Sequence, residues 1–382
     1  MMIVSLIIAL TVFTGLFVNA GRKLFMWLGL AAAGVNPILY GILYGAVICT
    51  VLGLFVISRI PDNRLPGWIF FIGHYALGLI LYLMMIVNAA DLLLFLGAAL
   101  RIIPPYRTMV PAIGIMVLAL SLAVTVYGAV HGASVQKKHY EIQIGPAPGN
   151  TSAGKDTLKT VLISDLHLGY VIGPSHLEQV VDAVNAADPD LICISGDIFD
   201  GDTSSLSDPE ALQRLFRQMH ATYGVYACLG NHDAGTNYDR MLDFMEKAGI
   251  TVLQDEAVII DSRFVLAGRR DSSPIGGQGG RRKEVKWPAG SESLPVIVMD
   301  HQPANIREYE RESALILCGH THQGQMFPFN LVTRAAFDVD YGYYRASAHS
   351  PQVIVTSGAG TWGPPLRVGT DSEVVDILVS FQ

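Results

Sequence analysis

The apolar first third of the chain constrains the fold more than any other feature. Residues 1–132 hold six Lys and Arg and only two acids, whereas the remaining 250 residues hold 20 basic and 31 acidic side chains. A membrane-spanning helix needs about 20 apolar residues. Four stretches reach that length, namely 2–20, 37–58, 67–90 and 109–130. We therefore expect residues 1–132 to form a transmembrane α-helical domain with about four spanning helices.

Two shorter apolar stretches, 24–34 and 92–100, cannot span alone, so they either extend neighbouring helices or lie at the interface. Asp91 falls where the third span should end, and we expect it to mark that boundary. The 2–20 stretch lacks the basic segment of a cleaved signal peptide, and further spans follow it.

The side of the membrane is only weakly indicated. Four spans would place the N-terminus and the C-terminal domain on one side. The Lys and Arg counts of the flanking loops balance, so the positive-inside rule does not decide. The basic Lys155 and Lys159 and the cysteines, which we expect to be free thiols, favour a multi-pass protein of the cell (inner) membrane with a cytoplasmic catalytic domain.

The rest of the chain has an α/β pattern. Residues 137–144 alternate like an edge strand and 145–156 form a loop, so we assign 133–156 to an edge strand and linker and 157–382 to a folded domain. Buried strands then alternate with helices, one of which should begin with a capping box at Ser175 and Glu178. Antiparallel pairing is expected between 257–261 and 263–268, and between 352–358 and 373–381, which makes the sheets mixed.

Five of the predicted strands end in polar clusters, "DLHLG", "GDIFDG", "NHD", "DHQP" and "GHTHQGQ". Because chemistry in such folds gathers at strand carboxyl ends, these side chains should converge. Carboxylate, amide and imidazole ligands without thiolates suit Mn, Fe, Zn or Ni, and of these we expect Mn. One cation needs about four ligands, so the larger set indicates two. The candidate metal ligands are Asp165, His167, Asp197, Asn231, His301, His320 and His322.

Two metal ions about 3.5–4 Å apart lower the pKa of a shared water and hold phosphoryl oxygens during in-line attack. Asp197, at the end of the second strand, is the natural bridge between them. His232, next to the ligand Asn231, is the candidate general acid for the leaving oxygen. We expect the neighbouring acids Asp200 and Asp233 to hold loops.

These five blocks resemble those of the calcineurin-like metallophosphoesterase superfamily over about residues 157–382. The resemblance implies two packed mixed β-sheets flanked by helices. It also implies one metal on Asp165, His167, Asp197 and His322, the other on Asp197, Asn231, His301 and His320, and His232 as proton donor. The apolar first third and "GAGTWGPPLRVG" (358–369) resemble the bacterial transmembrane branch, some of whose members hydrolyse UDP-2,3-diacylglucosamine, a lipid A precursor.

Two departures from that branch leave the substrate open. The fourth block carries Asp300 before its histidine, where a small or apolar residue is more usual. Residues 266–273 are rich in arginine, and a second basic stretch follows at 281–283. These basic side chains either meet a phosphate-rich substrate or form a solvated loop; they are Arg269, Arg270, Arg281, Arg282 and Lys283.

The sequence therefore predicts a metal-dependent phosphoesterase that works beside a lipid bilayer. The expected substrate is a phosphodiester or pyrophosphate, lipid-linked as in UDP-2,3-diacylglucosamine. Two alternatives stay open: the same chemistry on a soluble nucleotide, and a catalytically silent membrane scaffold. The negative charge of the C-terminal domain argues against nucleic acid as a partner.

Overall fold

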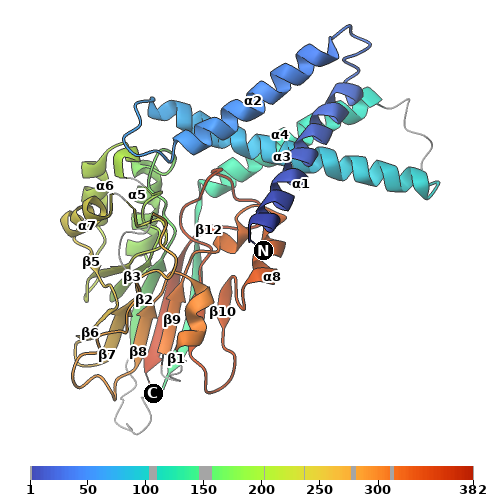
Figure 1. Ribbon diagram of the computed structural model, residues 1–382. Coiled ribbons are helices and arrows are strands. Elements are labelled where there is room, and N and C mark those ends of the chain that lie inside the picture. Colours follow the sequence, from blue (N-terminus) through green and yellow to red (C-terminus); the bar gives the residue numbers. More distant parts are fainter. Residues whose placement is uncertain are drawn as a thin grey trace. The chain divides into compact units, whose positions relative to one another are not determined.

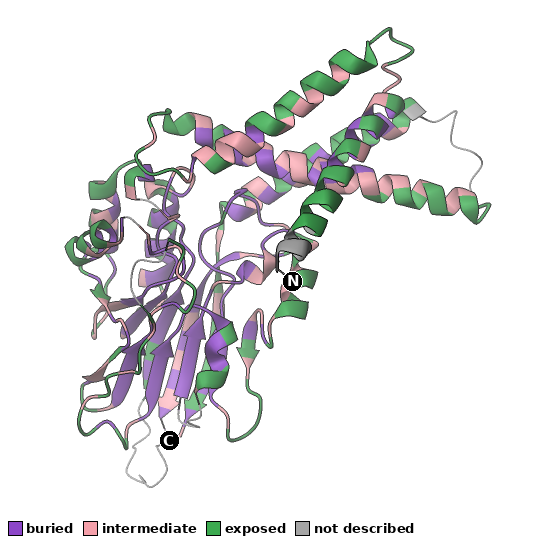
Figure 2. Ribbon diagram, viewed as in Figure 1, coloured by how far each residue is buried: buried purple, intermediate pink, exposed green. Residues whose placement is uncertain are grey.

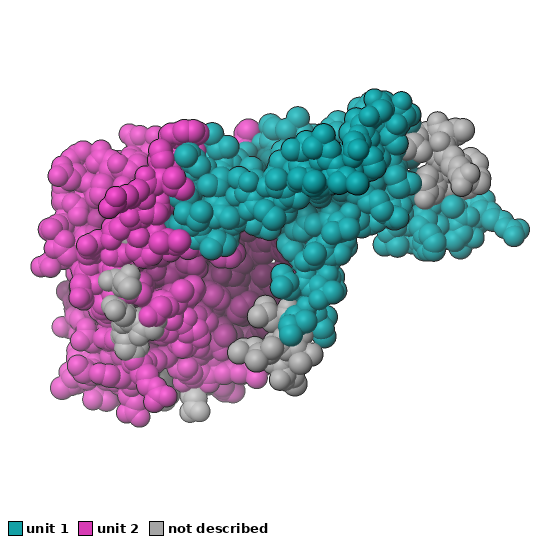
Figure 3. All heavy atoms as spheres, turned by 45° about the horizontal axis from the view of Figure 1, so that its top comes forward, with its two compact units in different colours: residues 1–58, 69–129 teal, residues 59–68, 130–382 magenta. Residues whose placement is uncertain are grey.

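The computed structural model describes residues 2–102, 110–145, 157–201, 203–235, 237–276, 281–309 and 314–381. The chain divides into two compact units (Figure 3). Unit 1 comprises residues 1–58 and 69–129, and unit 2 comprises residues 59–68 and 130–382. The short stretch 59–68 therefore belongs to the same unit as the C-terminal part of the chain.

Unit 1 is helical (Figure 1), and its helices are α1 (Met2–Trp27), α2 (Pro37–Ile57), α3 (Gly67–Ala99) and α4 (Val110–Gly132). Within the described ranges, three helices are long and apolar enough to cross a membrane: α2, α3 and the Pro111–Gly132 part of α4. The expected span over 2–20 lies in α1 and remains a prediction. Asn36 starts α2, because its Oδ1 accepts hydrogen bonds from the backbone N–H groups of Ile38 and Leu39.

The third helix is longer than expected. It continues to Ala99. Of the two alternatives for the 92–100 stretch, extension of a neighbouring helix is therefore the one that the structure shows. Asp91 lies inside α3, so the helix continues past the expected end of the third span, and the position of Asp91 at that boundary remains a prediction. Its Oδ1 is 2.5 Å from Lys23 Nζ of α1, and this ion pair compensates a carboxylate on an apolar helix.

Unit 2 holds two mixed six-stranded sheets. The first has the order β1 (Val135–Ile144), β12 (Ser372–Phe381), β2 (Thr157–Ile163), β3 (Leu191–Ser195), β4 (Val225–Cys228), β5 (Thr251–Val252). The second has the order β10 (Gly342–Tyr344), β11 (Gln352–Val355), β9 (Ala314–Cys318), β8 (Val296–Met299), β7 (Phe264–Gly268), β6 (Glu256–Ile260). Strands β2, β3 and β4 run parallel to one another, as do β7, β8 and β9.

The core of unit 2 lies in layers, and Figure 2 shows its strands as mostly buried. Between the sheets, fully buried side chains such as Leu162 and Cys193 pack with Leu266 and Leu317. The other face of the first sheet is covered by α5 (Pro174–Asn185), α6 (Pro209–Phe216) and α7 (Tyr238–Lys247), which share one apolar cluster with it. The expected fold class, two mixed sheets flanked by helices, is confirmed.

Several local expectations have clear outcomes. The β1 strand lies at a sheet edge, and β6 pairs antiparallel with β7, as predicted. The pairing of 352–358 with 373–381 is wrong, because β11 belongs to the second sheet and β12 to the first. The capping box at Ser175 is also wrong. The helix begins at Pro174, whose missing N–H needs no cap, and Gly173 precedes it without a side-chain hydrogen bond. The 145–156 loop lies, apart from Gly145, outside the described residues.

Candidate metal centre

The polar side chains meet because of the order of the strands. Strands β2, β3 and β4 are parallel neighbours in one sheet, and β8 and β9 are parallel neighbours in the other. Their carboxyl ends therefore lie at common edges. The sheets are joined next to the site, where Ser195 Oγ, at the end of β3, donates to the carbonyl of Leu317 in β9 at 2.9 Å. All eight sequence-predicted residues follow these five strands.

The backbone at the site is unusual. Five of the candidate ligands have left-handed φ angles, namely Asp165 (53°), His167 (48°), Asp197 (52°), His320 (74°) and His322 (49°). Each such residue costs about 1–3 kcal/mol, and such conformations cluster at functional sites. Two glycines leave the space that the Asp165 and Asp197 carboxylates occupy. A Cβ on Gly319 would lie 2.2 Å from Asp165 Oδ2, and one on Gly230 would lie 2.1 Å from Asp197 Oδ1.

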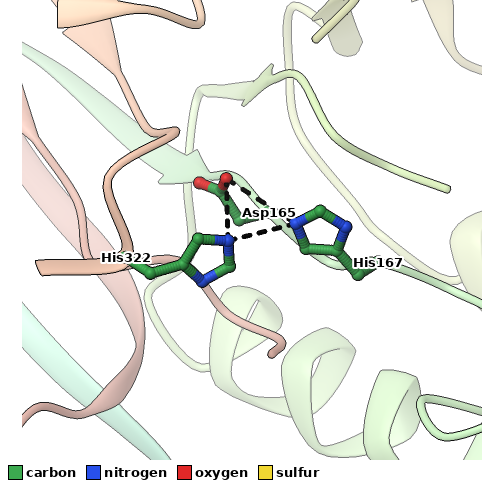
Figure 4. A group of neighbouring side chains, drawn as sticks. All are labelled: Asp165, His167 and His322. Atoms are coloured by element: carbon green, nitrogen blue, oxygen red, sulfur yellow. Dashed lines mark hydrogen bonds and ion pairs between the residues drawn. The ribbon is translucent and has the colours of Figure 1, made fainter. Parts of the chain in front are cut away.

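One group of donor atoms consists of Asp165, His167 and His322 (Figure 4). His322 Nε2 lies 3.3 Å from Asp165 Oδ1 and 3.1 Å from His167 Nε2. Asp165 is fully buried. Two imidazole nitrogens and a buried carboxylate oxygen thus converge, and these are ligand atoms that a divalent cation satisfies together.

A second group consists of Asp197, His301 and His320, with Asn231 beside them. Asn231 Oδ1 lies 2.9 Å from His320 Nδ1 and 3.2 Å from His301 Nε2. His301 is oriented from behind, because its Nδ1 lies 2.8 Å from the Ser195 carbonyl. A ring held in this way presents Nε2 to a metal.

Asp197 connects the two groups. Its Oδ2 lies 3.2 Å from His301 Nε2 and 3.7 Å from His167 Nε2. Burial raises the pKa of the Asp197 carboxyl, but the charge and hydrogen bond of His301 outweigh burial and lower that pKa well below its usual value. A carboxylate that is ionised between two donor groups has the position required of a bridging ligand.

His232 lies outside these two groups and forms a third group of neighbouring donor atoms with His167 and Asp200. Its backbone N–H donates to Asp197 Oδ1 at 2.9 Å, and its ring centroid is 5.0 Å from that of His167. Burial lowers the pKa of His232 to about 4, so the free imidazole is neutral near pH 7. The ring also lies 5.9 Å from that of Trp362, a half-exposed side chain that the sequence did not single out.

Two further residues support the ligands. Asp233 accepts hydrogen bonds from the backbone N–H groups of Ile198, Phe199 and Gly230, which confirms its expected role in holding loops. Arg367 was missed. Its buried guanidinium donates to the His322 carbonyl at 3.0 Å and to the carbonyls of Ser357, Gly358 and Gly360. The only sequence signal was an arginine in a run of Gly, Pro and apolar residues.

Two of the basic residues within 269–283 neither lie in a solvated loop nor form an open phosphate site: Arg269, which is buried, and Arg282, which is half-buried. Arg269 Nε lies 3.1 Å from Asp255 Oδ1, and Arg282 NH2 lies 2.5 Å from Asp300 Oδ2. The second pair accounts for the first departure only. The acid before His301 is neutralised by Arg282, which lies outside the 266–273 stretch.

The donor chemistry fits two divalent cations. Asp165, His167, Asp197 and His322 would hold one, and Asp197, Asn231, His301 and His320 would hold the other. No sulfur atom contributes to either group, which suits oxygen- and nitrogen-preferring ions.

Comparison with known proteins agrees with this chemistry. The family model described as calcineurin-like phosphoesterase matches residues 158–324. An uncharacterized metallophosphoesterase of Aquifex aeolicus is 32% identical over 246 residues, which cover 63% of this chain and 90% of that protein. An uncharacterized metallophosphoesterase of Helicobacter pylori is 30% identical over 228 residues, 57% of this chain.

A Danio rerio transmembrane protein with a metallophosphoesterase domain is 29% identical over 280 residues, 69% of this chain and 62% of that one. The chain spans only 58% of the length of the Helicobacter pylori relative. The membrane helices and the phosphoesterase domain thus occur together in a relative as well.

Proposed function

The chain belongs to the calcineurin-like metallophosphoesterase family, and on that premise we propose that it is a membrane-anchored enzyme with two metal ions that hydrolyses a phosphodiester or pyrophosphate bond in a lipid-linked substrate. The observation that carries the proposal is the position of Asp197 Oδ2, which lies 3.2 Å from His301 Nε2 and 3.7 Å from His167 Nε2. In this position Asp197 would serve as a ligand common to both metal sites.

When bound, the ions, which we expect to be Mn, supply an acidified water as nucleophile and neutralise the phosphoryl oxygens. The side chains of this protein fix that arrangement. Ser195 orients His301, and Arg367 holds the turn that carries His322. We assign His232 the donation of a proton to the leaving oxygen. Because burial lowers its pKa to about 4, the imidazole must gain a proton before it can act as a general acid.

An apolar surface in unit 2 supports a substrate with acyl chains. The turn η4 (His322–Gly324) carries the ligand His322, and α8 (Phe329–Ala336) follows it. Helix α8 has no buried residue. Leu331 and Val332 on it are 56% and 62% exposed, and Phe327 just before it is 53% exposed. Exposed apolar side chains of this kind mark interaction surfaces, and the same chain carries membrane helices.

The test compares substrates with and without acyl chains. Purified full chain in detergent with Mn²⁺ would be given UDP-2,3-diacylglucosamine, UDP-N-acetylglucosamine and bis-p-nitrophenyl phosphate. We expect the acylated substrate to have the highest kcat/KM. A preference for the unacylated nucleotide sugar would favour a soluble nucleotide substrate instead. No metal-dependent hydrolysis of any phosphoester would favour a silent scaffold.

The apolar surface has its own matched variants. Leu331→Ser/Val332→Ser should raise KM for the acylated substrate at least about tenfold, because burying one such side chain contributes about 1.5–3 kcal/mol. The control, Ala335→Ser/Ala336→Ser, places two serines in the same helix without removing large apolar side chains. Equal KM values for both double variants would remove the support for an acyl contact.

The catalytic domain faces the cytoplasm in this proposal, with the spans in the cell (inner) membrane. The connection between α2 and α3 belongs to unit 2, so this connection and the catalytic site share one side of the membrane. The free cysteines of the sheets, Cys193, Cys228 and Cys318, are buried and unpaired with one another, which agrees with a reducing compartment.

A further inference from the structure

The connection between α2 and α3 belongs to unit 2, as the candidate metal ligands do. Arg59, two residues beyond the end of α2, makes an ion pair with Asp200, and its NH1 also donates to the Asp200 carbonyl at 3.2 Å. The following residues are held as well. The Asp62 N–H donates to Ser204 Oγ at 3.1 Å, and Asn63 Nδ2 donates to Tyr170 Oη at 2.7 Å.

Asp200 leads from this connection to a metal ligand. Its Oδ1 lies 3.6 Å from Nδ1 of His167, a ring that is buried. The other nitrogen of that ring, Nε2, faces His322 at 3.1 Å. A histidine that binds a metal through Nε2 carries its proton on Nδ1, and an acceptor there fixes the tautomer and the ring orientation. At 3.6 Å the Asp200 contact is longer than a hydrogen bond, and among the described residues Nδ1 has no hydrogen-bond partner; Asp200 is the charged acceptor that lies beside it.

Arg59 is placed to hold Asp200 rather than to lie loosely at the surface. Its side chain is only 25% exposed, and that of Asp200 is 18% exposed. The Arg59 guanidinium carbon also lies 5.8 Å from the centroid of the Trp362 ring, at the edge of the site. Two hydrogen bonds to one residue and a contact with an aromatic ring restrict the guanidinium to one orientation.

We propose that Arg59 is a positioning residue of the metal centre: it fixes the Asp200 carboxylate, which in turn orients the ligand His167. The segment joining two membrane helices is then a structural part of the catalytic site. This inference rests on the proposed function, since it concerns the same metal centre. It assigns to the 59–68 segment a role beyond joining two helices.

The test measures metal affinity, not only hydrolysis. Purified full chain in detergent would be titrated with Mn²⁺, and free Mn²⁺ would be measured by its paramagnetic resonance signal. Arg59→Ala should weaken Mn²⁺ binding about tenfold or more, because loss of a group that orients a ligand typically costs 10–100-fold. Arg59→Lys should recover most of the affinity. Arg64→Ala removes the same charge from an exposed position of the same segment and should leave binding unchanged.

A double variant separates positioning from direct substrate contact. If Arg59 acts through Asp200, then Arg59→Ala/Asp200→Ala binds Mn²⁺ no more weakly than Asp200→Ala alone. Normal Mn²⁺ affinity in Arg59→Ala, with only a raised KM, would overturn the inference while leaving the proposed function intact. A wild-type chain that takes up no Mn²⁺ would overturn both. Thermal unfolding of the metal-free variants identifies any variant that has failed to fold, and Arg59→Lys then decides the case.

Discussion

The substitution Asp197→Asn tests the shared ligand most directly. Asparagine has nearly the same volume as aspartate, and its Oδ1 can still accept the hydrogen bond from the backbone N–H of His232, which is 2.9 Å long in the structure. The loop should therefore keep its shape. What is lost is the negative charge of the oxygen that faces both His167 and His301. Both metal positions should weaken together.

The expected change in Tm follows from the stabilisation that a bound metal ion gives to the folded state. A metal ion at 100 times its Kd stabilises the folded state by about 2.7 kcal/mol per site. For a domain of 150–250 residues, each kcal/mol shifts Tm by roughly 2–4 °C. Two filled sites should thus raise the Tm of the wild-type catalytic domain by about 10–20 °C. Asp197→Asn should show less than about a quarter of that shift at the same Mn²⁺ concentration.

The assay is thermal unfolding with and without Mn²⁺, with elemental analysis of metal bound per chain. The matched control is Asp271→Asn. Asp271 is a buried carboxylate near the site whose oxygens accept hydrogen bonds from Gln302 Nε2 at 2.8 and 2.9 Å, and it lies outside both donor groups. Two ions per chain and a full Tm shift in Asp197→Asn would refute the shared-ligand reasoning. An equal loss in Asp271→Asn would show that the effect is not specific.

Three further outcomes are expected. His232→Ala should lower kcat by about 10²–10⁴-fold on an alkyl phosphodiester and much less on a p-nitrophenyl ester, with metal content unchanged; loss of metal would make His232 a ligand. Arg367→Met should destabilise the metal-free protein by several kcal/mol, at about 1–3 kcal/mol for each buried carbonyl left without a donor; an unchanged Tm would contradict this. A C-terminal alkaline phosphatase fusion should be inactive and a C-terminal green fluorescent protein fusion bright; the reverse would place the domain outside.

Much of the candidate site could be predicted from local sequence. Each candidate ligand follows an apolar strand by a few residues, and parallel strands place their carboxyl ends at one edge. The position of Asp165 after β2, for example, needs only the run "LKTVLIS" and the polar residues behind it. The structure brings these side chains within a few ångströms of one another. Whether they hold metal stays a prediction that the Asp197 variant tests.

Strand partners were harder to predict than strand positions. The pattern of β11 and β12 shows which residues are buried, and both strands are almost wholly buried. It does not show which neighbour forms the hydrogen bonds, because two adjacent sheets bury the same kind of side chain. The start of α5 failed for a different reason. Pro174 fixes the first helical residue, and this local rule outweighs a capping pattern one residue later.

The interactions that orient the ligands come from distant parts of the chain, and no local pattern reveals them. Arg59 and Asp200 are 141 residues apart, Arg367 and His322 are 45 apart, and Arg282 and Asp300 are 18 apart. The last pair shows how such partners depend on each other. Removing one member of a buried ion pair costs about 3–5 kcal/mol, because the other charge is left uncompensated. Arg282 therefore stabilises the Asp300 carboxylate beside His301, and this partner lies 18 residues away from it in the sequence.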